Sequence, residues 1–208
     1  MEIFLVRHGE TMGNVAKRHQ AEHTQLSARG EAQAAAVGER LAALQPTHLL
    51  SSDLKRAVET ARVIGAQCDL VPEVDALFRE LGRPRHLHGH YHRSPASLWF
   101  YARWYLGWHD AAQGESYRAL RQRIQTAQAH LRTYPSDARI VLVTHSVFMN
   151  LMLAHLCREA ALWPHQALRT FAGVLTTPNT HMVRLQHEPP TDSAATTCAW
   201  RVGAPLEL

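Results

Sequence analysis

The chain has 208 residues, of which 46% are hydrophobic and 19% are charged. This composition excludes a disordered or fibrous protein and predicts a single domain, residues 1–208, with a substantial core. The formal charge of +4 mildly favours anionic ligands, but the basic residues are scattered and form no nucleic-acid-binding motif, so we expect no nucleic-acid partner.

No apolar run in the sequence is long enough to span a membrane, and the N-terminus has no basic region typical of a signal peptide. We therefore expect a cytoplasmic protein with no membrane partner. The sequence leaves the oligomeric state open, a homodimer included.

Short apolar runs alternate with helical patterns in the first half of the chain. Residues 1–6 predict a buried strand and residues 28–44 a helix with one apolar face. Residues 48–51 predict a second strand, and a second helix follows within residues 51–66. The expected helix boundaries are Ser27 and Pro46 for the first helix, and Ser52 or Asp53 and then Gly65 for the second.

The second half continues this alternation. The expected elements are a strand at 74–78, a helix between Ser116 and Pro135, a strand at 139–144, a helix at 147–156 with Ser146 as its N-cap, an outer strand at 180–185, a polar loop at 189–197 and an edge strand at 198–202. The alternation predicts an α/β fold, namely a three-layer α/β/α sandwich around a largely parallel central sheet.

Residues 79–110 interrupt this pattern. The segment begins with the basic, histidine-rich stretch RPRHLHGHYHR and continues into SPASLWFYARWYLGW, which contains Trp99, Trp104 and Trp108. We interpret it as a cap or substrate-specificity insertion, and ordinary packing of an inserted helix stays open as the alternative.

The alternating histidines of this segment, His86, His88, His90 and His92, would share one face of a strand and raise the question of a metal site. No cysteine or carboxylate completes such a set, so an exposed polar loop is favoured and no metal is expected. The three cysteines, Cys68, Cys157 and Cys198, are odd in number and have no CxxC spacing, which favours reduced thiols over a disulfide.

Polar residues follow three of the predicted strands where each strand ends. Arg7-His8 follows the first strand, Ser52-Asp53 with Arg56 follows the second, and His145-Ser146 follows the strand at 139–144. Because the carboxyl ends of parallel strands lie along one edge of the sheet, we expect these side chains to gather there beside helix N-termini. Two arginines and two histidines in such a place predict a phosphate site.

Histidine in such a site can do more than bind. A neutral imidazole can attack phosphorus while arginines withdraw charge from the phosphoryl oxygens, and those arginines also lower the pKa of the imidazole. A carboxylic acid must then protonate the leaving oxygen, and Glu80 is the first candidate, with Glu115 as the second.

Five stretches in this order, LVRHGET, SSDLKRAVETA, LFRE, GES and VTHS, resemble the histidine phosphatase superfamily, the phosphoglycerate-mutase-like group with an Arg-His-Gly signature. The resemblance extends from Leu5 to Ser146. It implies that His8 is transiently phosphorylated, and that Glu80 acts first as the acid and then as the base that activates water. It further implies a phosphate pocket formed by Arg7, Arg56 and His145, with Asn14 and Thr11 nearby, and it implies no cofactor.

The sequence departs from the family where substrate choice is usually made. Many relatives continue after the acid with Gly-x-Trp-Glu-Gly, whereas Glu80 is followed by Leu81-Gly82-Arg83-Pro84-Arg85. Arg83, Arg85 or His86 is therefore expected to touch the substrate. The inserted segment with paired arginines found in cofactor-dependent mutases has no counterpart here.

We accordingly predict a phosphomonoester hydrolase acting on a small phosphorylated metabolite. The alternatives are a phosphomutase of the phosphoglycerate type and, in a different class, a non-catalytic protein that binds a phosphorylated ligand or nucleic acid.

Overall fold

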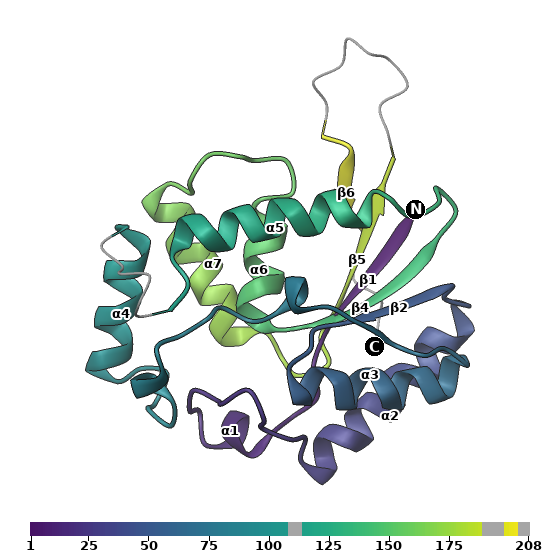
Figure 1. Ribbon diagram of the computed structural model, residues 1–208, viewed down its shortest axis with the longest axis horizontal. Coiled ribbons are helices and arrows are strands. Elements are labelled where there is room, and N and C mark those ends of the chain that lie inside the picture. The colour runs from purple at the N-terminus through teal and green to yellow at the C-terminus, as the bar shows by residue number, and fades with distance from the viewer. Residues whose placement is uncertain (108–113, 189–197, 204–208) are drawn as a thin grey trace.

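The computed structural model describes residues 1–107, 114–188 and 198–203, which form helices around one central sheet (Figure 1). The strands are β1 (Glu2–Arg7), β2 (His48–Ser51), β3 (Glu73–Val74), β4 (Arg139–Thr144), β5 (Met182–His187) and β6 (Trp200–Val202). The α-helices are α1 (Met12–Val15), α2 (Ala28–Ala43), α3 (Lys55–Cys68), α4 (Pro95–Tyr105), α5 (Tyr117–Leu131), α6 (Ser146–Ala154) and α7 (Pro164–Thr176), and two 3₁₀ turns are η1 (Ala76–Phe78) and η2 (Arg85–Leu87).

The sheet has six strands in the order β3-β2-β4-β1-β5-β6. The first four strands are parallel to one another, β5 runs antiparallel to β1, and β6 runs antiparallel to β5. The largely parallel sheet that the sequence predicted is confirmed. In the β1–β4 register Arg7 lies opposite Thr144, so the two residues that follow, His8 and His145, leave the same edge of the sheet side by side.

Helices cover both faces of the sheet (Figure 1). Successive residues of a strand point to opposite faces of the sheet. In β1, Phe4 and Val6 pack with Leu41 of α2 and Ile64 of α3, whereas Ile3 and Leu5 face α5 and α6. Both clusters are buried, and together they give the three layers expected from the sequence.

Two predicted boundaries are wrong by a few residues. The second helix begins at Lys55, and its N-cap residue is Leu54, which forms no side-chain cap. Asp53 does not cap this helix because its carboxylate forms an ion pair with Arg79 at 2.6 Å. This helix continues through Gly65 to Cys68. Glycine is needed at position 65 because a Cβ added there would clash with the Leu70 carbonyl oxygen.

The strand predicted at 74–78 is mostly absent, since only Glu73–Val74 pairs with β2. The Asp75 side chain accepts a hydrogen bond from the Leu77 amide at 2.8 Å and turns the chain into η1. Ser146 is not an N-cap either. It is the first residue of α6, and its hydroxyl donates to the Val174 carbonyl at 2.8 Å.

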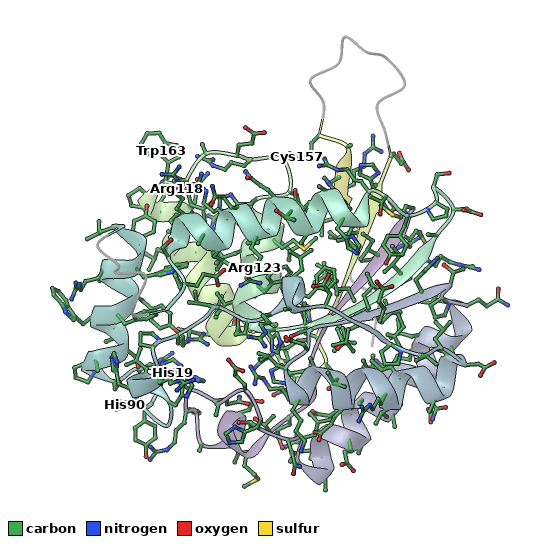
Figure 2. All side chains as sticks on the ribbon, viewed as in Figure 1. His19, His90, Arg118, Arg123, Cys157 and Trp163 are labelled. Carbon is green, nitrogen blue, oxygen red and sulfur yellow. A yellow bond between two sulfur atoms is a disulfide. The ribbon has the colours of Figure 1, made fainter. Side chains whose placement is uncertain are left out.

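The prediction of reduced cysteines is wrong for two of the three. Cys157, which Figure 2 labels, forms a disulfide with Cys198, and their Cα atoms are 5.5 Å apart. Cys68 alone is free. The pair is 41 residues apart in sequence, and the fold brings the segment after α6 close to the start of β6. The count and spacing of cysteines carry no information about such a long-range approach.

The segment around α4 has mixed burial. Trp104 is fully buried, whereas Trp99 is exposed, and Trp108 lies outside the described residues, as does the loop predicted at 189–197. The alternating histidines do not form a strand, because η2 and turns occupy that stretch. Within the described ranges, no helix has the length and apolar character needed to cross a bilayer.

Candidate active site

His8 is held in one orientation immediately after β1. Its Nδ1–H donates to the Gly9 carbonyl at 2.7 Å, and its Nε2 accepts from Arg56 Nε at 3.2 Å. The imidazole is therefore in the tautomer that leaves a lone pair on Nε2. Burial, followed by the positive charges of Arg56 and Arg7, lowers the pKa of His8 well below its ordinary value. The ring is neutral at pH 7 and can act as a nucleophile.

His145 lies beside His8, with ring centroids 5.1 Å apart, and is fully buried. Its Nε2 is 2.8 Å from the Ser52 hydroxyl, which accepts from the Leu54 amide at 3.3 Å. When the Ser52 hydroxyl donates this bond, the ring proton of His145 lies on Nδ1. Nδ1 has no partner among the described residues. Burial, and next the charge of Arg56, lowers the pKa of His145 well below its usual range.

Two arginines bring positive charge to the histidines. Arg56 is buried and donates to the Ala21 carbonyl at 3.2 Å. Burial lowers the pKa of Arg56 to about 10, so its guanidinium stays charged at neutral pH. Arg7 donates to the Thr177 carbonyl, and its Nε is buried without a partner in the described part of the chain. Unpaired donors of this kind fit an anion as their missing partner.

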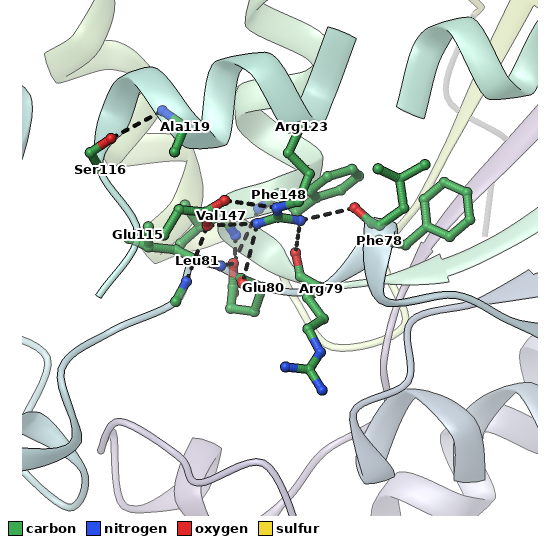
Figure 3. A network of polar contacts seen from close by, with 12 residues as sticks. Phe78, Arg79, Glu80, Leu81, Glu115, Ser116, Ala119, Arg123, Val147 and Phe148 are labelled. Carbon is green, nitrogen blue, oxygen red and sulfur yellow. Dashed lines mark hydrogen bonds and ion pairs between the residues drawn. The ribbon is translucent and has the colours of Figure 1, made fainter. Parts of the chain in front are cut away.

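Glu80 is held at the N-terminus of α6. Its carboxylate accepts from the amides of Val147 at 3.2 Å and Phe148 at 3.1 Å, and from Leu81 at 3.0 Å (Figure 3). These three amides hold the Glu80 carboxyl group in one orientation at the start of α6. The carboxylate lines the same cavity as His8 and Arg56.

Glu115, the second candidate for the acid, is occupied elsewhere. Arg123 forms a bidentate ion pair with the Glu115 carboxylate, with Nε–Oε1 and Nη2–Oε2 distances of 2.8 and 2.7 Å (Figure 3). The same guanidinium donates to the carbonyls of Leu77 at 2.9 Å and Arg79 at 2.7 Å. Glu115 and Arg123 therefore position the backbone that carries Glu80.

Arg7, His8, Arg56 and Glu80 line a cavity of about 1210 Å³. Its polar floor contains Arg7, His8, Arg56 and Glu80, and a cationic rim is formed by Lys17, Arg18, Arg83 and Arg93. The remaining wall is made largely of apolar side chains from α4 and α7. A cavity with a cationic floor and one carboxylate fits a phosphorylated ligand.

Residues 3–191 match the sequence profile of the histidine phosphatase superfamily (branch 1). The chain belongs to this superfamily. Among its relatives, proteins named "Probable phosphoglycerate mutase GpmB" are 34% identical over 161 residues in Klebsiella pneumoniae, covering 74% of both chains, and 33% identical over 180 residues in Citrobacter koseri, covering 81% of this chain and 80% of the relative.

Solved structures show the same fold as this histidine phosphatase. "Mycobacterial hydrolase 1" superposes with a TM-score of 0.75 at 26% identity, covering 98% of this chain and 97% of the other. A mycobacterial glucosyl-3-phosphoglycerate phosphatase, solved in complex with VO3, gives 0.74 at 25% identity with the same coverage.

The fold of this histidine phosphatase brings most of the predicted site residues together, but not all of them. Arg83 lines the cavity and donates from Nε to the Tyr101 hydroxyl at 3.0 Å. Arg85 and His86 lie exposed on η2 and do not line the cavity, so substrate contact by either residue stays a prediction. Thr11 is buried as the N-cap of α1 and hydrogen-bonds to Asn14 instead of lining the cavity.

Sequence reasoning missed Asn179, which follows α7. Its amide donates to the His8 carbonyl and to Asn14 Oδ1, both at 3.1 Å, and it lines the cavity. The residue joins the nucleophile loop to the segment before β5. A single asparagine in a turn-rich stretch gives no sequence signal for this role.

The histidine-rich segment supplies walls of this phosphatase's cavity. His92 and His19 both line it, with ring centroids 4.8 Å apart, and Figure 2 shows His19 near His90. Burial, and next Arg83, lowers the pKa of His19 to about 3. Across residues 1–107, 114–188 and 198–203, no group of histidine, cysteine or carboxylate side chains is arranged to hold a metal ion.

Proposed function

We propose that this histidine phosphatase hydrolyses small phosphomonoesters through a phosphohistidine at His8, without a metal. The observation that carries the proposal is the buried, neutral His8 with its Nε2 lone pair held against the Arg56 guanidinium. Arg7, Arg56 and the free Nδ1–H of His145 supply the positive charge and the donors that the phosphoryl oxygens need during transfer.

In the first step Nε2 of His8 attacks phosphorus, the N–P bond forms and the ester P–O bond breaks. Glu80, as the carboxylic acid, gives its proton to the departing alkoxide. In the second step the Glu80 carboxylate takes a proton from water, whose oxygen attacks phosphorus, and the N–P bond breaks to release inorganic phosphate and neutral His8.

The test is phosphate release from a generic aryl phosphate in excess EDTA, comparing the wild type with His8→Ala. We expect turnover that survives EDTA and is lost in the variant. Loss of turnover in EDTA would contradict the metal-free scheme, and turnover by His8→Ala would contradict the role of His8.

A phosphoglycerate-type mutase is the second candidate, because the curated relatives carry that name. A mutase would share the first step and then return the phosphoryl group to a different oxygen of the same product. Incubation with 3-phosphoglycerate separates the two functions, since a mutase forms 2-phosphoglycerate whereas a phosphatase releases inorganic phosphate.

The cytoplasmic location expected from the sequence is also a proposal, and the Cys157–Cys198 pair tests it. Disulfides persist mainly in oxidising compartments. Alkylation of intact cells before lysis should label both cysteines if the protein is cytoplasmic, and a pair that stays unlabelled until reduction would contradict that location.

A further inference from the structure

The cavity above the phosphate site has one wall that the proposed chemistry does not use. Three large side chains of α4 line it, Leu98 and the rings of Tyr101 and Tyr105, and α7 adds Leu168, Phe171 and Leu175. Figure 1 shows α4 and α7 on the same side of the molecule, at one end of α5. The wall, which we call the α4–α7 wall, is continuous with the floor that contains His8 and Glu80.

The base of the α4–α7 wall is rigid. The Phe171 ring lies 5.5 Å from that of Tyr101 and packs edge-on against buried Trp104 at 5.8 Å, both measured between centroids. These contacts fix α4 against α7 and preform the surface. A preformed apolar surface loses little conformational entropy when a ligand binds.

The rim of the α4–α7 wall is apolar and open to water. Leu98, Leu168 and Leu175 are 57%, 74% and 53% exposed. Leucines on the surface of a protein need no special explanation when they are scattered, but these three border one concave site. Covering them with a non-polar group would remove apolar surface from water, which is favourable.

The wall also offers few polar groups to a sugar or polyol. The Tyr105 hydroxyl donates to the Leu162 carbonyl at 2.9 Å, and the Tyr101 hydroxyl accepts from Arg83. The Tyr101 O–H can still donate one hydrogen bond, but a polyol packed there would give up more hydrogen bonds to water than it regains, which is costly.

We propose that the leaving group of the substrate is a bulky apolar alcohol, aromatic or aliphatic, that packs on the α4–α7 wall while its phosphoryl group meets Nε2 of His8. This inference rests on the proposed hydrolase function and narrows its substrate class. Leu98 and Leu168 are then residues that determine specificity, since they touch the leaving group and not the phosphate.

The test compares kcat/KM for ethyl, butyl and hexyl phosphate with that for glycerol 3-phosphate. We expect a rise of about two- to fourfold per added methylene, the upper value being the gain for complete burial, and glycerol 3-phosphate should be a poor substrate. The double variant Leu98→Ser/Leu168→Ser should flatten this rise. Both leucines are exposed, so the variant should fold normally.

Leu106→Ser is the matched control. Leu106 caps the C-terminal end of α4, is 55% exposed and does not line the cavity, so this variant should keep the wild-type rise. If kcat/KM does not rise along the alkyl phosphates while phosphate release still depends on His8, the inference is wrong and the proposed function stands. The same holds if kcat/KM rises as steeply in the double variant as in the wild type. Absence of phosphate release from every ester would overturn the proposed function together with it.

The cationic rim suggests the competing type of substrate, one with a second anionic group. Lys17 and Arg93 line the cavity and have no ion-pair partner in the described part of the chain. A preference for 3-phosphoglycerate over hexyl phosphate that disappears in Arg93→Ala would overturn the inference.

Discussion

Replacing Arg123 with methionine isolates the contribution of the network behind Glu80. Methionine keeps a long apolar side chain but removes both bonds to the Glu115 carboxylate and the three bonds to the carbonyls of Leu77, Arg79 and Glu80. Breaking a fully buried ion pair costs about 3–5 kcal/mol. The Arg123 and Glu115 side chains keep 18% and 17% of their surface exposed, so we expect a loss of about 2–4 kcal/mol in the free energy of unfolding.

This loss converts to a fall in melting temperature of about 4–16 °C for a chain of this size. Calorimetry or circular dichroism measures it. Phosphate release, assayed well below the melting temperature, should show kcat reduced about 10–100-fold with little change in KM, because the backbone that carries the acid shifts relative to the leaving group.

Arg118→Met is the matched control on the same helix. Arg118 is exposed, and within the described residues its side chain forms no hydrogen bond or ion pair; Figure 2 shows both arginines on α5. If Arg123→Met melts within about 2 °C of this control, or keeps its kcat, the network does not position Glu80 and the reasoning is wrong.

Three further predictions concern the rest of the molecule. Asn179→Ala removes two hydrogen bonds at the nucleophile loop, so kcat/KM should fall about tenfold, and unchanged steady-state kinetics would contradict the role of this amide. Burial lowers the pKa values of His8 and His145. At a pH below the ordinary histidine pKa, the unfolded chain therefore binds more protons than the folded protein. The melting temperature should fall as the pH drops from about 7.5 to about 5. A flat pH profile would contradict neutral buried histidines. Dithiothreitol should lower the melting temperature by about 4–16 °C. The reason is that the Cys157–Cys198 disulfide closes a long loop and contributes about 2–4 kcal/mol to the free energy of unfolding. An unchanged melting curve would contradict this contribution.

The parts of the site that follow strand ends could be predicted from the sequence. In a parallel sheet the carboxyl ends of neighbouring strands meet, and the β1–β4 register places Arg7 opposite Thr144. The proximity of His8 and His145 follows from that rule. Arg56 is one turn after β2 and reaches the same edge for the same reason.

The remaining parts depend on contacts between segments far apart in sequence. α7 was not predicted, and only Ala167 of its residues is fully buried, because much of its apolar face borders the cavity instead of the core. The Cys157–Cys198 approach and the place of Asn179 likewise arise only when the chain is folded. Local turn chemistry at Asp75 overrode the apolar pattern that favoured a strand.

Trapping the phosphorylated enzyme tests the central claim most directly. The wild type would be mixed with excess aryl phosphate, quenched in alkali within milliseconds and digested for mass spectrometry of the peptide that contains His8. The account predicts one phosphoryl group on His8, stable in alkali and lost in acid, that disappears as substrate is exhausted. A phosphoryl group on another residue, or phosphate release with no labelled peptide at any time, would contradict it.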